Sequence, residues 1–137
     1  MRHQKIRTRL TQKPAHGRML VRNLVTSMFL YEKVRTTKKR AEAVIPEIDH
    51  LIRYAGTHEP HVAIRYLNAK ITDKNASRKV MEVLKDRFAK RHSGLTRMVP
   101  AGSRKGDGAQ LVDLTFVEGE EVTIEATPKK TSASKKK

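Results

Sequence analysis

An apolar stripe with helical spacing runs through the centre of the chain and constrains its fold more than any other feature. The stripe recurs every three or four residues and comprises Ala41, Val44, Ile45, Ile48, Leu51, Ile52 and Ala55. Thr37 has the residue type of an N-cap and Gly56 that of a C-terminal stop, so the pattern predicts a helix that reaches Ala55. Pro46 lies inside the pattern and predicts a kink or a break into two helices. The kink is favoured because the stripe continues in phase beyond Pro46.

Other periodic segments surround this helix. Apolar spacing predicts a first helix over 16–31, a short helix over 59–67, and a further helix that Thr72 caps and that continues towards Phe88. Residues 96–99 and 111–117 are typical of strands that form a hairpin around a glycine-rich loop at 101–110, and residues 33–36 are typical of a third, short strand. The predicted fold class is α+β: a two-layer α/β domain in which a small mixed sheet, made of the short strand and the C-terminal hairpin, is covered by helices.

Composition limits both the core and the surroundings of the protein. Only 4% of the residues are aromatic and 37% are hydrophobic, so the core must be modest and largely aliphatic. Cysteine is absent, which excludes a disulfide framework and a thiolate metal site. No apolar run approaches the roughly 20 residues that a membrane span needs. We therefore expect a soluble, cytoplasmic protein with no membrane partner.

The charge of the chain is high and unevenly distributed. Lys and Arg number 30 against 14 Asp and Glu, a formal charge of +16, which favours a polyanionic partner, nucleic acid ahead of an anionic membrane. No acidic residue occurs from Met1 to Tyr31. We predict three segments: a basic N-terminal arm over 1–15 that orders on its partner, a globular RNA-binding domain over 16–117, and a disordered lysine-rich tail over 118–137.

The candidate RNA contacts are basic residues in the arm, the first helix, the short strand, the start of the second helix and the hairpin. The turn Lys38–Arg40 is the strongest, because the macrodipole disfavours cations at a helix N-terminus and a bound anion would compensate. His3 and His16 fit an indifferent surface as well as an RNA contact, and a plain turn is the favoured interpretation of the hairpin loop. The candidates are Arg2, His3, Lys5, Arg7, Arg9, Lys13, His16, Arg18, Arg22, Arg35, Lys38, Lys39, Arg40, Arg97, Arg104 and Lys105. Contacts on several sides are typical of a protein embedded in folded RNA, and differ from the single recognition helix of helix-turn-helix proteins.

Patterns for catalysis or metal binding are weak. Asp49 and His50 are neighbours on a helix and face different directions, so their spacing does not make them a catalytic dyad. His58 and His61 lack both the spacing and the further ligands of a zinc site. The loop over 102–108 fails the Walker A pattern in its spacing and its ending. We predict no catalytic residue, no metal and no cofactor.

Several segments, taken in order, resemble the L-seventeen family of bacterial large-subunit ribosomal proteins. The segments are Met1-Arg2-His3, His16 to Arg18 leading to Arg22-Asn23-Leu24, Val34 to Thr37 followed by Ala41 and Pro46, Gly94 to Arg97, and Arg104 to Asp107 before Leu111 to Val117. The resemblance runs through about residues 1–117. No single segment is decisive, and the ordered set carries the specificity.

The resemblance implies a structural, non-catalytic protein that binds and holds together segments of large-subunit ribosomal RNA near the outer end of the peptide exit tunnel. It implies neighbouring ribosomal proteins as further partners and a place in the cytoplasmic ribosome, with no homo-oligomer expected. It adds Asn23, beside Arg22, to the candidate RNA contacts. Two other classes stay open: a nucleoid-type protein, which would also bind arbitrary duplex DNA, and a small enzyme acting on RNA, which would need an acid or base in a cleft.

Overall fold

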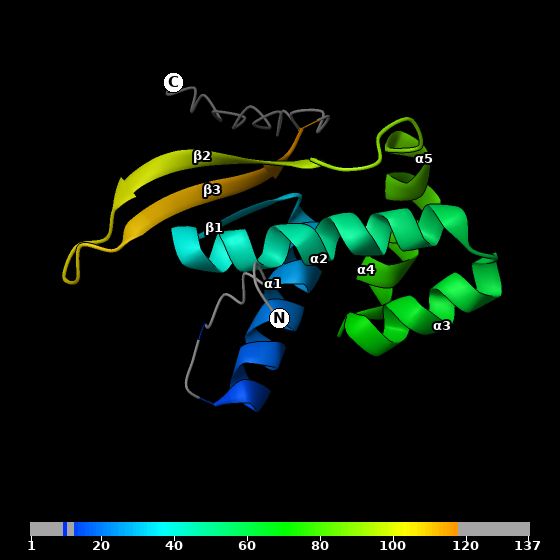
Figure 1. Ribbon diagram of the computed structural model, residues 1–137, viewed down its shortest axis with the longest axis horizontal. Helices are drawn as coiled ribbons and strands as arrows, with labels where there is room; N and C mark the ends of the chain where they lie inside the picture. The colour runs from blue at the N-terminus through cyan, green and yellow to red at the C-terminus, as the bar shows by residue number, and fades with distance from the viewer. Residues whose placement is uncertain (1–9, 11–12, 118–137) are drawn as a thin grey trace, which may run out of the picture.

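The computed structural model describes residue 10 and residues 13–117, and it places a layer of helices against a three-stranded sheet (Figure 1). The predicted tail over 118–137 lies outside the described residues, as does most of the predicted arm over 1–15. The elements, in chain order, are α1 (Pro14–Tyr31), β1 (Lys33–Thr37), α2 (Lys38–Thr57), α3 (Pro60–Lys70), α4 (Lys74–Lys79), the π-helix η1 (Val80–Leu84), α5 (Lys85–Arg87), β2 (Thr96–Ser103) and β3 (Gln110–Phe116). The predicted α+β class is confirmed.

The sheet has the strand order β1-β3-β2, and both pairs of neighbouring strands are antiparallel. The prediction of a mixed sheet was therefore wrong. β1 and β2 do run in the same direction, but β3 lies between them and separates them. The register opposes Arg35 on β1 to Asp113 on β3, and Asp113 to Val99 on β2. The last strand that the structure describes is thus the central strand of the sheet.

The hairpin of β2 and β3 is longer than the sequence predicts, and it projects at one end of the molecule (Figure 1). The glycine-rich loop, predicted over 101–110, is confined to 104–109 because β2 continues to Ser103 and β3 begins at Gln110. Pro100 is tolerated inside β2 because β2 is an edge strand, where a missing N–H breaks no required ladder bond. The pairing becomes irregular between Pro100 and Ser103.

α2 is the central helix of the core, and its predicted stripe is confirmed. Every predicted position of the stripe is buried except Ile45, which is half-buried. The helix remains continuous through Pro46, so the proline does not break it in two. The inner face of β3 packs against this layer through Val112, Leu114 and Phe116. The Phe116 ring stacks on that of Phe29 at 6.5 Å and lies 5.4 Å from that of Phe88.

Helix ends differ from the predictions in ways that local chemistry explains. α1 begins at Pro14 and not at His16, because a proline in the first turn loses no helical hydrogen bond. α3 covers 60–70, beginning at a proline and extending beyond the predicted 59–67. The cap of α4 is Asp73, whose carboxylate accepts from Asn75 N at 2.7 Å. The predicted cap, Thr72, instead donates its backbone N–H to the hydroxyl of Thr26 on α1 at 3.2 Å.

A polar junction joins the end of α1 to α4 and α5. Glu32 follows α1 with the left-handed backbone angles φ 59° and ψ −6°. One carboxylate oxygen lies 2.6 Å from Nζ of Lys79, and the other lies 2.8 Å from a terminal guanidinium nitrogen of Arg87. The Lys79 ammonium also donates to the carbonyl oxygen of Leu30 at 3.1 Å. These contacts join the short helices α4 and α5 to the end of α1.

Candidate nucleic-acid interface

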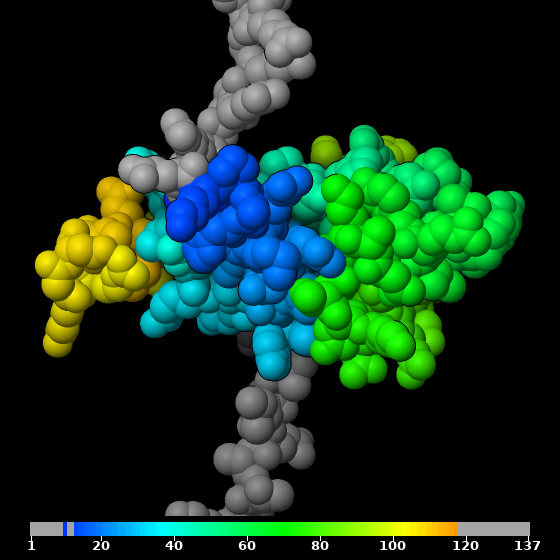
Figure 2. Space-filling model, turned by 90° about the horizontal axis from the view of Figure 1, so that it is seen from below, coloured from blue at the N-terminus to red at the C-terminus, as the bar shows by residue number. Residues whose placement is uncertain are grey.

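The beginning of α1 carries several of the predicted contacts at the surface. Arg2, His3, Lys5, Arg7 and Arg9 lie outside the described residues. Lys13, His16, Arg18 and Asn23 are exposed. Seen from below, the first turns of α1 form the surface between the hairpin and the helices at the opposite end (Figure 2). Arg22 differs from its neighbours, because it is half-buried and its Nε donates to the carbonyl oxygen of Lys70, the last residue of α3, at 3.2 Å.

The outer face of the sheet carries cations around one carboxylate. Arg35 binds Asp113 through two hydrogen bonds of 2.7 and 3.0 Å, and the Lys33 ammonium lies 3.6 Å from the same carboxylate. Hydrogen bonding to Arg35 is the main reason that the pKa of Asp113 lies below its ordinary value, so this acid is ionised at neutral pH. Arg97 and Lys33 both lie opposite Thr115, from the two sides of β3. Three cations and one anion leave this group of residues with a net positive charge.

The basic turn at the start of α2 lies beside the hairpin. The predicted position is confirmed, since Lys38, Lys39 and Arg40 are exposed in the first turn of α2. Thr37 is the N-cap, but its side chain makes no capping hydrogen bond, so it does not satisfy the backbone N–H groups of that turn. Lys38 also lines a hollow of about 490 Å³ together with Pro100, Leu111 and other residues of the two hairpin strands. Helix start and hairpin therefore form one continuous region.

The two predicted cations of the hairpin tip, Arg104 and Lys105, lie in different environments. Arg104 pairs with Asp107 within the loop, through a hydrogen bond of 2.9 Å from Nε and a second from a terminal nitrogen. This pairing is the main reason that the pKa of Asp107 lies far below its ordinary value. Lys105 is exposed at the tip. Gly106, with φ 116°, adopts a backbone angle that side chains rarely allow, so the tight tip depends on glycine there.

The residues with possible catalytic chemistry are engaged in structural contacts. The carboxylate of Asp49 accepts the backbone N–H groups of Gly94 and Leu95 at 3.0 and 3.3 Å, whereas His50 contacts the hydroxyl of Tyr66 at 3.1 Å. The two side chains thus reach different partners, as their spacing predicts. In residues 13–117, no group of three or more potential ligands is placed to hold a metal ion. No described helix is long and apolar enough to cross a membrane.

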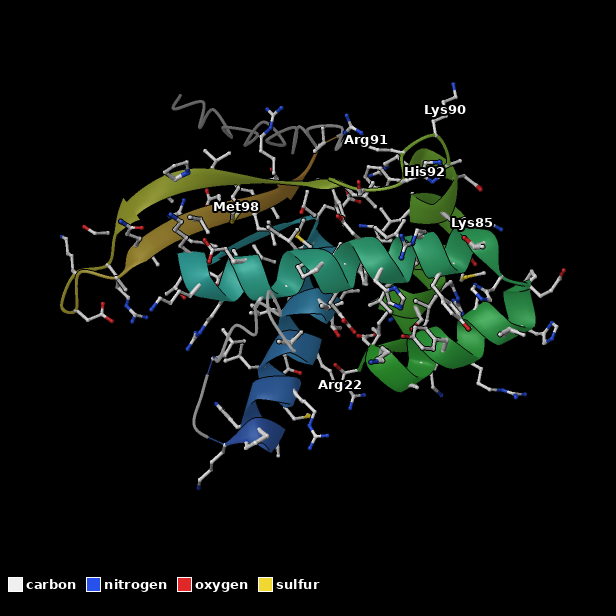
Figure 3. The ribbon with its side chains drawn as sticks, viewed as in Figure 1. Arg22, Lys85, Lys90, Arg91, His92 and Met98 are labelled. Atoms are coloured by element: carbon white, nitrogen blue, oxygen red, sulfur yellow. The ribbon has the colours of Figure 1, made fainter. Side chains whose placement is uncertain are left out.

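Two further groups of surface residues were not among the predicted contacts. Lys85, Lys90, Arg91 and His92 gather around α5 and the turn that follows it (Figure 3). The run Lys90-Arg91-His92 was the available signal in the sequence. The second group is a set of aromatic rings on α2 and α3 that includes Tyr54 and His58. Its signal was the i, i+4, i+8 spacing of His50, Tyr54 and His58, which places three rings along one side of a helix.

The fold and this surface define a class: a small, basic α+β protein whose exposed cations lie on several different elements of its described structure. Comparison with known families matches residues 20–117 to the family described as Ribosomal protein L17. The chain belongs to the ribosomal protein L17 family, and it is a structural constituent of the large ribosomal subunit, not an enzyme. Its place in the cell is accordingly the cytoplasmic ribosome.

Curated bacterial proteins support this membership over nearly the whole chain. The large ribosomal subunit protein bL17 of Chloroflexus aggregans is 38% identical over 117 residues, which cover 85% of this chain and 100% of that protein. The protein of the same name from Pelobacter propionicus is 34% identical over 127 residues, covering 93% of this chain and 98% of its own length. The protein of that name from Solibacter usitatus is 36% identical over 120 residues. The predicted family is therefore confirmed.

Proposed function

We propose that this protein binds large-subunit ribosomal RNA and holds several RNA segments together near the outer end of the peptide exit tunnel, beside other ribosomal proteins. The family membership supports association with the ribosome. In this proposal the arm over 1–15 and the domain over 16–117 supply the RNA contacts. The lysine-rich tail over 118–137 is a separate appendix.

The observation that carries the proposal is the placement of cations on both layers of one rigid framework. Arg35 and Arg97 lie on the outer face of the sheet, whereas Lys39 and Arg40 lie at the start of the helix that packs on its inner face. The sheet and α2 share a continuous hydrophobic core, so the distance between these cations is fixed. Phosphate contacts position a protein without reading sequence, and a rigid spacing lets them select a particular fold of RNA.

Arg35 fits this role although it is already paired with Asp113. Arg35 uses Nε and one terminal nitrogen for Asp113. A guanidinium carries five N–H donors, so the donors on its remaining nitrogen can bind a phosphate. Asp113 thus holds Arg35 in one orientation and reduces the side-chain freedom that RNA binding would otherwise have to restrict.

A salt titration with matched variants tests the proposal. The variant K39Q/R40Q removes two cations from the start of α2, and K74Q/R78Q removes two exposed cations from α4, outside the predicted set. Each phosphate contact contributes about 0.7–0.9 to the slope of log K against log salt, so K39Q/R40Q should lower the slope for ribosomal RNA by about 1.4–1.8. K74Q/R78Q should leave the slope nearly unchanged.

Equal slope changes in the two variants would contradict defined phosphate contacts at α2. Equal affinity for arbitrary duplex DNA and for large-subunit RNA at the same salt would contradict the RNA function and favour a nucleoid role. Sedimentation of a lysate at high salt gives the corresponding result in the cell. We expect the protein to remain with the large subunit after the wash.

A further inference from the structure

Three aromatic rings form a continuous stack where α2 and α3 meet, at the end of the molecule opposite the hairpin (Figure 1). The ring of Tyr66 on α3 lies 4.1 Å from that of Tyr54 on α2, with 26° between their planes. The ring of His58, which follows α2, lies 3.8 Å from that of Tyr54, with 13° between their planes. Rings at these separations are in direct face-to-face contact, so the three form one stack, here named the ring stack.

One ring of the ring stack, that of His58, takes no part in joining α2 to α3. Tyr54 and Tyr66 are half-buried, and their contact joins α2 to α3. His58 is exposed, yet its ring is held parallel to Tyr54 because its Nδ1 donates to the carbonyl oxygen of Tyr54 at 3.2 Å. One face of the His58 imidazole is covered by Tyr54. The other face is presented outward in a fixed orientation, at the end of the stack.

The other end of the ring stack is also held in place. His50 contacts the Tyr66 hydroxyl at 3.1 Å, and its ring meets the Tyr66 ring edge to face at 5.9 Å. The Lys70 ammonium lies 5.9 Å from the centre of the Tyr66 ring, and the carbonyl oxygen of Lys70 accepts from Nε of Arg22. These contacts hold the Tyr66 ring from the side opposite to His58.

The charges around the ring stack favour an anionic ligand. Arg53 and Arg65 are exposed on the same two helices, each one residue before a tyrosine of the stack, and Arg22 and Lys70 adjoin its inner end. Two acids lie in the same region. Glu47 is paired with the Lys70 ammonium at 3.6 Å, and Glu59 is exposed as the N-cap of α3. Four of these six charged residues are cations, so together they carry a net positive charge.

We propose that the outer face of His58 is a stacking site for an unpaired base of ribosomal RNA, with the ring stack as its platform. Sequence-tolerant recognition of single-stranded RNA uses aromatic faces on which bases stack, together with cations for the backbone. The ring stack supplies the first element, and Arg53 and Arg65 supply the second. The inference rests on the proposed RNA-binding function, and it adds an unpaired base to the phosphate contacts of the sheet and α2.

Ultraviolet crosslinking of the full chain to protein-free large-subunit ribosomal RNA tests the site, because rings stacked on bases form adducts at zero distance. We expect an RNA adduct on the peptide that contains residues 54–58. The variant H58A should lose this adduct and bind the RNA about fivefold or more weakly. H58F keeps a ring and should retain both. Y31A removes an exposed tyrosine on α1, outside the ring stack, and should change neither.

The outcomes separate the site from the general function. Binding of ribosomal RNA at unchanged affinity by H58A, with adducts only in other peptides, would overturn the stacking site and leave the RNA function intact. Weaker incorporation of H58A into large subunits without any adduct on residues 54–58 would assign the ring stack to a protein neighbour and also overturn it. Failure of the unmodified chain to prefer ribosomal RNA over duplex DNA would overturn the proposed function itself.

Discussion

Replacing Glu32 with Gln tests the polar junction that holds the end of α1 against α4 and α5. Glutamine keeps the size and the left-handed backbone of Glu32 but removes the charge that both Lys79 and Arg87 approach. The side chains of Glu32, Lys79 and Arg87 are 21%, 27% and 24% exposed, respectively, so each keeps about a quarter of its surface in water. The variant therefore leaves two largely covered cations without their anion.

The loss of unfolding free energy expected for E32Q lies between two limits. Exposed ion pairs contribute about 0–1 kcal/mol, and breaking a fully buried pair costs about 3–5 kcal/mol. With the exposure of these side chains, we expect E32Q to lower the free energy of unfolding by about 2 kcal/mol at pH 7. Urea unfolding followed by circular dichroism measures this difference. The control E82Q removes an exposed carboxylate from η1 and changes the net charge equally.

The difference in unfolding free energy between E32Q and the unmodified protein should also depend on pH. Burial raises the pKa of Glu32, but hydrogen bonds and charge from Lys79 and Arg87 outweigh it and hold the pKa below its ordinary 4.5. A carboxyl with a lowered pKa in the folded state stabilises the protein above the unfolded pKa, and this contribution is lost as pH falls through the folded value. The gap between E32Q and the unmodified protein should therefore close in acid. A gap at pH 7 no larger than that of E82Q, or one that persists in acid, would refute the reasoning.

Three other perturbations test the hydrophobic core, the contact of Asp49 with the segment before β2, and the N-terminal arm. Phe29→Ala removes a fully buried ring stacked on Phe116 and should lower the free energy of unfolding by about 3–5 kcal/mol. Calorimetry should then show a Tm lower by about 12 °C or more, and a drop below about 5 °C would contradict this prediction. Asp49→Ala removes the acceptor for the backbone N–H groups of Gly94 and Leu95 and should lower the free energy of unfolding by about 1–3 kcal/mol. Amide hydrogen exchange should become faster at Leu95 but not in α1, and unchanged exchange at Leu95 would argue against a stabilising role for Asp49. Deleting residues 1–13 should preserve the circular dichroism spectrum, because α1 begins at Pro14, and should lower the salt slope for RNA by about 0.7–0.9 per lost contact; an unchanged slope would show that the arm makes none.

The architecture was predictable where the signal is local. The α2 stripe and the alternation in β3 fix which faces are buried, because helix and strand periods differ and each pattern is uninterrupted. The chain direction of β1 relative to the hairpin has no such local signal. It depends on which edge of the hairpin β1 joins, and the pairing of Lys33 with Thr115 is decided by packing across the whole domain.

The candidate site was predictable in composition but not in its pairing. The exposed cations at the start of α2 and on α1 are where the sequence places them. The partner of Arg35 is 78 residues away, so no short-range pattern indicates that Asp113 will orient it. The ring stack shows the same limit. One helix supplies Tyr54 in a recognisable spacing, while Tyr66 arrives from the neighbouring helix through tertiary packing.

The central position of β3 also sets the order in which the protein can complete itself during synthesis. β1 emerges from the ribosome early, yet the strand that pairs with it in residues 13–117 is β3, the last described element of the chain. Until Gln110–Phe116 has been made, β1 and β2 have no shared partner and the Phe29 ring lacks its stacking companion. The helices can gather first, but the surface that displays Arg35 and Arg97 at a fixed spacing comes into existence only as the final strand is inserted. A chain that ends before β3 thus carries Arg35 and Arg97 without the sheet that sets the spacing between them.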